Sequence, residues 1–197
     1  MTRQLILVRH SLPEAVPTVA PSEWSLSSKG RELARALARE LSIHKPDALF
    51  SSTEPKAVET GEIIARVLGI RNQVVPDLHE HAGRRAEDWV PGSEFRDRLS
   101  RFFRNPSKLV FGTETANDAH DRFARAIDAI AANVSSGCAV VVSHGTVISL
   151  FTARAGGLDS FEVWGHLTCP GFFRMRIPGL EILDEWRLPK SWLHSLD

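Results

Sequence analysis

The chain has 197 residues, of which 43% are hydrophobic and 24% are charged, and its formal net charge at pH 7 is zero. This length and composition are typical of a globular protein with one sizeable core, and they exclude a disordered chain. A net charge of zero gives no overall field that would attract nucleic acid or an acidic membrane surface, although it leaves room for a local charged patch. We therefore expect neither nucleic acid nor a membrane among the partners of this protein.

No segment has the length of a membrane span or of a signal-peptide core. The first apolar run, Leu5 to Val8, is interrupted by Arg9, and no later run approaches the roughly 20 apolar residues that a span needs. Cys138 and Cys169 have neither CxxC spacing nor the pattern of a disulfide framework, so we expect both to be reduced and to have packing roles. A cytoplasmic location follows as the default expectation.

Three short apolar runs predict strands of a parallel sheet, because an apolar run without alternation suits a strand that is covered on both faces. Ligands of such sheets bind beyond the carboxyl ends of the strands, so polar residues at these ends predict one shared site. Those residues are Arg9 and His10 after residues 5–8, Ser51 and Ser52 after residues 48–50, and Ser143, His144 and Gly145 after residues 138–142.

Helical patterns alternate with these strands. Each has apolar residues at a spacing of three or four, and capping residues, Gly or Pro mark its ends. The expected helices are residues 27–41, residues 53–68 ending at Gly69, residues 95–103, residues 123–134 ending at Gly137, and the segment after Gly145.

The last part of the chain differs from this pattern. Residues 173–177 alternate between apolar side chains and arginines, Pro178 and Gly179 suit a turn, and the chain then returns, which predicts an antiparallel hairpin at a sheet edge. Together the elements predict an α/β fold: a three-layer sandwich with a mostly parallel central sheet, an antiparallel edge hairpin and helices on both faces. We expect a single domain, residues 1–197, in which a short segment at about 82–117 caps the site.

Lys56 is unusual because a cation in the first turn of a helix opposes the helix dipole. A nearby anion would remove the conflict. The alternative is a solvated surface lysine, whose cost is only some tenths of a kcal/mol.

The side chains gathered at the predicted site suit a phosphate group. Arg9, Lys56 and two histidines, together with the first amides of the helix that starts at Gly145, would bind a dianion. A neutral imidazole is a competent nucleophile for phosphorus. Either His10 or His144 could therefore form a phosphohistidine.

Phosphoryl transfer also needs an acid that protonates the leaving alkoxide. Glu80 is a candidate if the short apolar strand before it, at Val74 and Val75, ends in the same crevice. Position in the sequence does not select Glu80 over Glu14 or Glu87.

Five short motifs occur in a fixed order along most of the chain. They are Leu7-Val8-Arg9-His10, then Trp24, Leu26, Ser27 and Gly30, then Ser51, Ser52, Pro55, Lys56, Ala57 and Thr60, then Leu78 and Glu80, and last Ser143-His144-Gly145. With these motifs the chain resembles the histidine phosphatase superfamily, the phosphoglycerate-mutase-like or branch 1 histidine acid phosphatases. The resemblance implies that His10 is the nucleophile that becomes phosphohistidine and that Glu80 is the proton donor. It also implies that Arg9 and His144 bind the phosphoryl oxygens.

The chain departs from the family pattern at three places. Ser11 stands where the leading motif usually continues with glycine, which we expect to be tolerated. Lys56 stands where the second motif usually has arginine, and lysine cannot grip two oxygens through a planar fork, so a lower affinity or an altered substrate is expected. The asparagine that usually follows the leading histidine has no counterpart in residues 13–18.

These observations predict a metal-independent phosphomonoester hydrolase that acts through a phosphohistidine and needs no cofactor. Its substrate would be a small phosphorylated metabolite or a phosphoprotein. One alternative is phosphoryl transfer of the phosphoglycerate-mutase type, although so short a cap would hold a bisphosphate intermediate poorly. The other is a non-catalytic phosphate-binding module, for which Ser11 and Lys56 are the reason. The oligomeric state does not follow from the sequence.

Two other chemistries have weaker support. His79 and His81 have the spacing of metal ligands, but the segment supplies too few of them, so we predict no metal site. Ser143 beside His144 suggests a serine hydrolase, yet no Gly-x-Ser-x-Gly elbow occurs. Substrate specificity is expected from residues 12–23, from the cap and from residues 156–170, with Arg84, Arg85, Trp89 and Trp164 as candidates.

Overall fold

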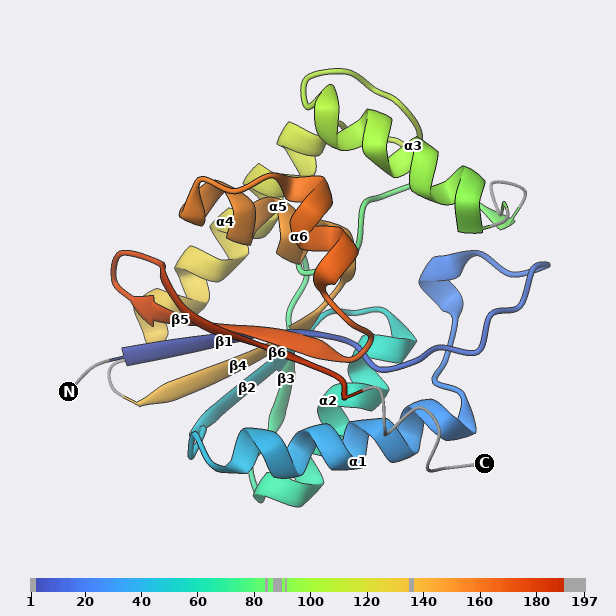
Figure 1. Cartoon of the computed structure of the whole chain (residues 1–197). Helices are drawn as coiled ribbons and strands as arrows, with labels where there is room; N and C mark the ends of the chain where they lie inside the picture. Colours follow the sequence, from blue (N-terminus) through green and yellow to red (C-terminus); the bar gives the residue numbers. More distant parts are fainter. Residues whose placement is uncertain (1–2, 84, 87–89, 91, 135–136, 190–197) are drawn as a thin grey trace.

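A six-stranded sheet forms the middle of the computed structural model, which describes residues 3–83, 85–86, 90, 92–134 and 137–189. The strand order is β3-β2-β4-β1-β5-β6 (Figure 1). The strands β1 to β4 pair in parallel, whereas β5 pairs antiparallel with both β1 and β6. The expected mostly parallel sheet with an antiparallel edge hairpin is confirmed. The strands are β1 (Arg3–Arg9), β2 (Ala48–Ser51), β3 (Asn72–Val74), β4 (Cys138–Ser143), β5 (Gly171–Ile177) and β6 (Glu181–Arg187).

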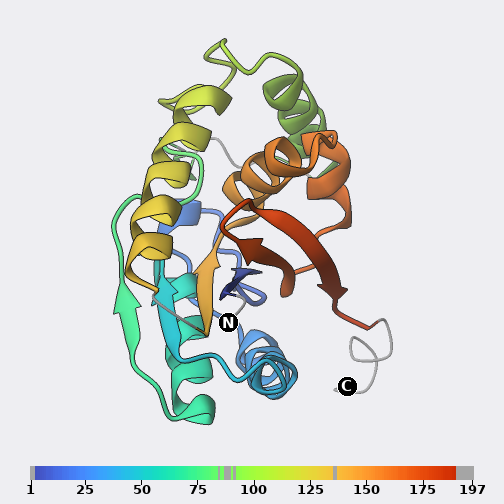
Figure 2. The same cartoon turned by 90° about the vertical axis from the view of Figure 1, so that its left-hand side faces the viewer.

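Helices cover both faces of this sheet, as expected. In Figures 1 and 2, α1 and α2 lie on one face, α4, α5 and α6 lie on the other, and α3 lies beyond α6. In the described part of the chain, no helix is both long and apolar enough to cross a membrane. The helices are α1 (Ser28–Ser42), α2 (Pro55–Leu68), α3 (Gly92–Arg104), α4 (Ala116–Asn133), α5 (Gly145–Gly156) and α6 (Ser160–His166), with a short 3-10 helix, η1, at Pro21–Glu23.

The apolar run of β1 divides between two hydrophobic cores. Ile6 and Val8 belong to the core beneath α1 and α2, whereas Leu5 and Leu7 belong to the core beneath α4 and α5. All four side chains are fully buried. A strand that faces helices on both sides has no solvent face, which is why its sequence shows no polar alternation.

The helix ends follow their capping residues, with one exception. Ser27 caps α1 by accepting a hydrogen bond from a backbone N–H of the first turn, and Gly69 ends α2 with a φ of +70°. The expectation that Gly137 ends the fourth helix is wrong, because α4 already ends at Asn133. Gly137 instead has a φ of +88°, and a Cβ there would lie 2.1 Å from Asp47 Oδ2.

The sequence analysis did not predict α6. This helix has seven residues, and its N-cap Asp159 accepts a hydrogen bond from Glu162 N at 2.9 Å. An Asp followed three residues later by a Glu is a capping signal that could have revealed it. The helix matters for the site because it carries Trp164.

Substituting Gly30 with alanine is predicted to destabilise the fold. A Cβ at this buried position of α1 would lie 2.0 Å from the carbonyl oxygen of Leu12, which belongs to the backbone and cannot rotate away. The expected loss in the free energy of unfolding is about 1–3 kcal/mol, the usual cost of overpacking. Urea denaturation of the parent and of Gly30→Ala measures this difference in the free energy of unfolding.

The matched control is Gly92→Ala at the start of α3, where a Cβ would meet nothing within 4 Å. This variant should be as stable as the parent or slightly more so, since alanine favours helix over glycine. Equal urea midpoints for Gly30→Ala and the parent would contradict the prediction.

Candidate active site

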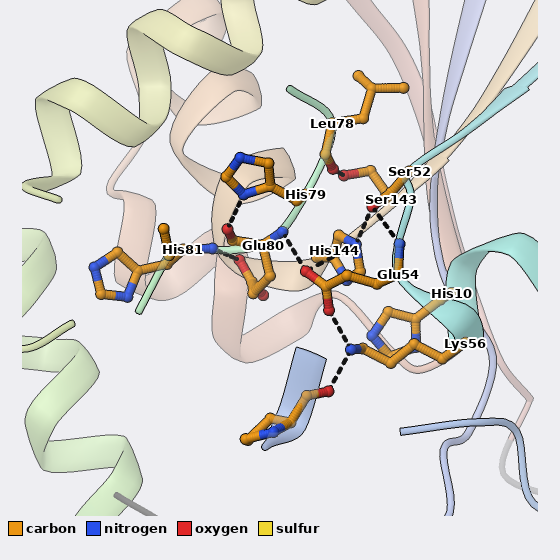
Figure 3. A network of polar contacts seen from close by, with 12 residues as sticks. His10, Ser52, Glu54, Lys56, Leu78, His79, Glu80, His81, Ser143 and His144 are labelled. Carbon is orange, nitrogen blue, oxygen red and sulfur yellow. Dashed lines mark hydrogen bonds and ion pairs between the residues drawn. The ribbon is translucent and has the colours of Figure 1, made fainter. Parts of the chain in front are cut away.

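The carboxyl ends of neighbouring strands bring the two histidines together. Arg9 ends β1 and is followed by His10, whereas Ser143 ends β4 and is followed by His144, the N-cap of α5. The two imidazole rings have centroids 5.1 Å apart and planes inclined by 60° (Figure 3). Residues 134 positions apart in the chain thus form one pair.

A pocket of about 390 Å³ opens beside this pair. A larger hollow of about 810 Å³ lies between α4 and the β2–β3 edge, but no histidine lines it among the described residues. We therefore place the site in the smaller pocket, where the ionisable groups gather. Its lining includes Arg9, His10, Glu54, Lys56, His79, Glu80 and Thr146, with Trp24, Phe95 and Trp164 as aromatic walls.

His10 is held in one tautomer and stays uncharged. Its Nδ1 lies 2.7 Å from the carbonyl oxygen of Ser11, and since a carbonyl only accepts, Nδ1 carries the proton and Nε2 keeps a lone pair. Burial, aided by the charges of His144, Lys56 and Arg9, holds the pKa of His10 well below 6.5. His10 is therefore a neutral imidazole near neutral pH.

His144 is fully buried and also uncharged near neutral pH. Its Nε2 lies 2.8 Å from Ser52 Oγ, and burial, followed by the charge of Lys56, holds the pKa of His144 well below 6.5. His144 Nδ1 and Arg9 Nε are buried and have no hydrogen-bond partner among the described residues. The described part of the chain thus leaves two nitrogens of the site without a hydrogen bond.

Arg9 lies against the start of α5. One of its terminal nitrogens, Nη1, donates to the carbonyl of Leu167 at 2.7 Å. A Cβ at Gly145 would come within 3.1 Å of Arg9 Cζ and Nε, so the glycine lets the guanidinium pack on the helix. The next amide, Thr146 N, donates to Glu80 Oε2 at 3.1 Å. One of the first amides of α5 is therefore engaged by a carboxylate of the site itself.

Glu80 lies in the pocket, on the loop that follows β3. Ser143 Oγ donates to the carbonyl of Leu78 at 2.6 Å and fastens this loop to β4, while Glu80 Oε1 accepts from the amide of His81 at 2.9 Å. Of the two other acids that the sequence left open, Glu14 is exposed and does not line the pocket, and Glu87 lies outside the described residues. Glu80 is accordingly the better placed of the three.

Lys56 is buried beside a carboxylate that the sequence analysis missed. Its Nζ donates to the carbonyl of Pro21 at 2.6 Å and forms an ion pair with Glu54 Oε2 (Figure 3). Lys56 is only 5% exposed, so the alternative of a solvated surface lysine is wrong. Glu54 is the N-cap residue of α2, and its negative charge there offsets the conflict between Lys56 and the helix dipole. An acid two residues before this lysine was the available signal.

Glu54 also joins Lys56 to the rest of the site. Its second oxygen, Oε1, accepts from the backbone amide of Glu80 at 2.8 Å and lies 3.6 Å from His144 Nε2. One carboxylate thus contacts the cation from α2, the loop that carries Glu80 and the histidine from α5.

Ser11 helps to hold the segment that carries His10 and is more than a passive replacement of glycine. Its side chain is fully buried, and its Oγ donates to the carbonyl of Gly30 at 2.7 Å. Its amide donates to Thr60 Oγ1 at 3.0 Å. Ser11 therefore connects the chain directly after His10 to both α1 and α2.

Cys169 is a second contact of His10 that the sequence analysis missed. Its Sγ donates to the carbonyl of His10 at 3.1 Å, and burial raises the pKa of the thiol. Cys138 lies inside β4, where burial, with the charge of Asp47, raises its pKa to about 12. Both cysteines are free thiols, as expected.

The geometry gives no support to the two weaker chemistries. In Figure 3 the ring of His81 points away from His10 and His144, and His81 packs against Phe102 and Phe111. Within the described ranges, no three His, Cys, Asp or Glu side chains are grouped so as to hold a metal ion. The hydroxyl of Ser143 is buried and bonded to the carbonyl of Leu78, so it does not serve as a nucleophile.

Of the four residues suggested for substrate specificity, Trp164 lines the pocket, where its ring stacks on Phe161 at an interplanar angle of 9°. Arg85 is exposed. Arg84 and Trp89 lie outside the described residues, so both stay predictions.

The buried histidines predict that the fold loses stability in mild acid. Because the pKa values of His10 and His144 are lowered from 6.5, the unfolded chain binds more protons than the folded one below that pH. The free energy of unfolding should therefore fall as the pH drops from about 6.5 to about 5, by up to about 1.4 kcal/mol per pH unit for each histidine. Urea titrations across this range measure the slope.

The variants His10→Asn and His144→Gln should each show a shallower slope. His44 is the matched control, because its pKa is lowered too but it lies outside the pocket. The variant His44→Gln should keep most of the parent's slope. A free energy of unfolding that does not change between pH 7 and 5 would show that the two rings are charged when folded.

Solved structures with a similar fold include hydrolases and phosphatases. The structure titled mycobacterial hydrolase 1 has a TM-score of 0.75 at 20% identity, with 95% of this chain and 99% of that chain covered. A mycobacterial glucosyl-3-phosphoglycerate phosphatase has a TM-score of 0.68 at 20% identity, with 88% and 90% covered. A phosphoserine phosphatase mutant from Entamoeba histolytica, in complex with phosphoserine, has a TM-score of 0.72 at 16% identity, with 98% and 100% covered. At these identities the similarity shows the fold.

The sequence itself matches the family model of the histidine phosphatase superfamily (branch 1) over residues 5–169. No curated protein sequence matches the chain. The matched span starts within β1 and ends just before β5, so it contains the paired histidines, the Glu80 loop and Lys56. The resemblance inferred from the five motifs is confirmed. The chain belongs to branch 1 of the histidine phosphatase superfamily.

Proposed function

We propose that this protein hydrolyses phosphomonoesters and that His10 carries the phosphoryl group between the two steps. The observation that carries the proposal is the pair of buried, uncharged imidazoles, 5.1 Å apart, in which His144 Nδ1, like the nearby Arg9 Nε, has no hydrogen-bond partner among the described residues. Membership of the histidine phosphatase superfamily and the phosphatases among the similar structures support it.

In the first step His10 Nε2 attacks phosphorus. The N–P bond forms while the bond from phosphorus to the ester oxygen breaks, and the leaving oxygen takes a proton from the carboxyl of Glu80. Arg9 and Lys56 neutralise the charge on the phosphoryl oxygens and the uncharged His144 binds them, and catalysis of phosphoryl transfer lies mostly in such charge stabilisation. An incoming phosphoryl dianion repels a nearby carboxylate, and so it favours the protonated form that an acid needs.

In the second step water attacks the phosphohistidine. Its oxygen bonds to phosphorus, its proton passes to the carboxylate of Glu80, and the electron pair of the breaking N–P bond returns to His10 Nε2. Inorganic phosphate leaves and the site is restored. The hydrogen bond from Nδ1 to Ser11 keeps the ring in the same tautomer throughout, so Nε2 is again the nucleophile.

Substrate selection is assigned to the walls of the pocket. Ala82, Gly83 and Phe95 line it from the segment at about 82–117, which supports the interpretation of this segment as a cap. Trp24 and Trp164 line it as well, and flat apolar walls suit a leaving group with an apolar face. We favour a small phosphorylated metabolite over a phosphoprotein, because a pocket of about 390 Å³ matches a small ligand.

Hydrolysis is preferred to the two alternatives. A mutase must hold a bisphosphate, and within the described lining Arg9 and Lys56 are the only lysine or arginine side chains. A non-catalytic module was suggested by Ser11 and Lys56. Both are built into the site with satisfied hydrogen bonds, so neither argues for lost turnover.

The variant His10→Ala is predicted to abolish turnover of a generic aryl phosphate such as p-nitrophenyl phosphate. Parent enzyme that is quenched at high pH should retain a phosphoryl group that is stable in base and labile in acid, as a phosphohistidine is, and the variant should retain none. The measurements are steady-state release of p-nitrophenol and intact-protein mass after a rapid quench at high pH.

The control is His44→Gln, which changes a histidine outside the pocket and should keep the parent's rate. Turnover that persists in folded His10→Ala would contradict the role of His10. A parent protein that binds inorganic phosphate but releases no p-nitrophenol would favour the non-catalytic module instead.

Lys56→Met is predicted to lower kcat/KM by about 10²-fold, because it removes a buried cation from the lining of the pocket in which the phosphoryl group would be transferred. The exposed Lys108 supplies the control, and Lys108→Met should leave kcat/KM unchanged. A parent-like kcat/KM in Lys56→Met would show that the charge of Lys56 serves only to balance Glu54.

A further inference from the structure

Arg122 is a buried cation outside the pocket, and within the described part of the chain it forms hydrogen bonds to Glu114 and to the loop that carries Glu80. It lies on α4, and its residue is 9% exposed. Arg122 Nη1 donates to the carbonyls of Asp77 and His79 at 2.7 and 3.0 Å, and Nη2 donates to the carbonyl of Glu80 at 3.2 Å. One guanidinium thus binds three backbone carbonyls within four residues of the loop that carries Glu80.

Glu114 fixes Arg122 from the other side. Its Oε1 accepts from Arg122 Nη2 at 2.6 Å and its Oε2 from Arg122 Nε at 3.2 Å, so the pair is bidentate. Glu114 Oε1 also accepts from the amide of Ala82 at 2.8 Å, and His81 Nε2 donates to the carbonyl of Glu114 at 2.9 Å. We call Arg122 and Glu114 the α4 clamp. It contacts the chain on both sides of Glu80.

The loop needs such a clamp because it has no regular backbone hydrogen bonds of a helix or a sheet. Residues 75–83 belong to no helix or strand, and Asp77 has a φ of +67°, so the carbonyls of this stretch have to find donors elsewhere. The α4 clamp supplies them on one side. On the other side Glu54 accepts from the amide of Glu80, and Ser143 donates to the carbonyl of Leu78.

We propose that Arg122 is a positioning residue, which sets the place of the Glu80 carboxyl for proton transfer to the leaving group. This inference rests on the proposed function. The bond from Nη2 ends on the carbonyl of Glu80 itself, so a shift of the guanidinium moves the acid directly. A misplacement of about 1 Å can cost about 10²-fold in rate when a reacting group has to meet its partner in a fixed geometry.

The test compares two aryl phosphates that differ in their need for an acid. The phenolate of 2,4-dinitrophenyl phosphate leaves without a proton, whereas that of phenyl phosphate needs one. We expect Arg122→Met to lower kcat/KM for phenyl phosphate about tenfold or more relative to 2,4-dinitrophenyl phosphate. A loss of folded protein would lower the apparent kcat/KM for both substrates by the same factor and leave their ratio unchanged.

Glu80→Gln calibrates the experiment. It should lower the same ratio by about 10²-fold or more, the usual contribution of a general acid. Adding Arg122→Met to Glu80→Gln should then change the ratio no further, because two residues that act through one group are not additive.

Two further variants complete the set. Arg125→Met, an exposed arginine on the same helix, should leave the ratio at the parent's value. Glu114→Gln keeps an acceptor for Arg122 but removes the negative charge of residue 114, so it should also lower the ratio, by a smaller factor. It decides the matter if Arg122→Met does not fold.

The outcomes separate this inference from the proposed function. If Glu80→Gln lowers the ratio, a parent-like ratio in folded Arg122→Met overturns the positioning role. Where Arg122→Met does not fold, a parent-like ratio in Glu114→Gln overturns it instead. A parent-like ratio in Glu80→Gln overturns Glu80 as the acid and the inference with it. In that case loss of turnover in His10→Ala still supports the phosphohistidine.

Discussion

The site depends on two imidazoles that remain uncharged while buried side by side. The parallel register of β1 and β4 runs from Gln4 and Cys138 to Arg9 and Ser143, so the next residues of both strands, His10 and His144, have to be neighbours. Arg9 and Lys56 add positive charge around them. A proton on either ring would be repelled by that charge, and no solvent would stabilise the charged ring. Burial in the sheet and the nearby cations together therefore keep both rings uncharged, the form that the proposed attack on phosphorus requires.

The proposed acid has a different kind of support. The histidines follow strands directly, but Glu80 lies on a loop, and the loop is fixed by side chains from several elements. Glu54 holds its amide, Thr146 N binds its carboxylate, and Arg122 binds its carbonyl. These bonds approach Glu80 from α2, α5 and α4. A loop residue held on three sides is positioned almost as firmly as one on a strand.

The sequence was most informative where burial imposed the pattern. The apolar runs before His10 and His144 could be interpreted because strands between two helical layers admit few polar residues, and the residues that end them follow from the sheet. Glu54 was missed because its role arises from the bend between β2 and α2. Arg122 was missed because the backbone carbonyls that it binds lie more than 40 residues earlier in the chain, and an arginine on a helix is usually exposed. The contacts of Arg122 with these carbonyls have no local sequence signal.

The ion pair between Glu54 and Lys56 affects how readily an anion dissociates from the pocket. Glu54 already neutralises this lysine and is fixed beside it by the amide of Glu80. Any phosphate that binds Lys56 has to compete with a carboxylate that is always present, whereas an unpaired cation would hold it with its full charge. In the proposed reaction, Glu54 would therefore compete with the product phosphate for Lys56 and favour its release.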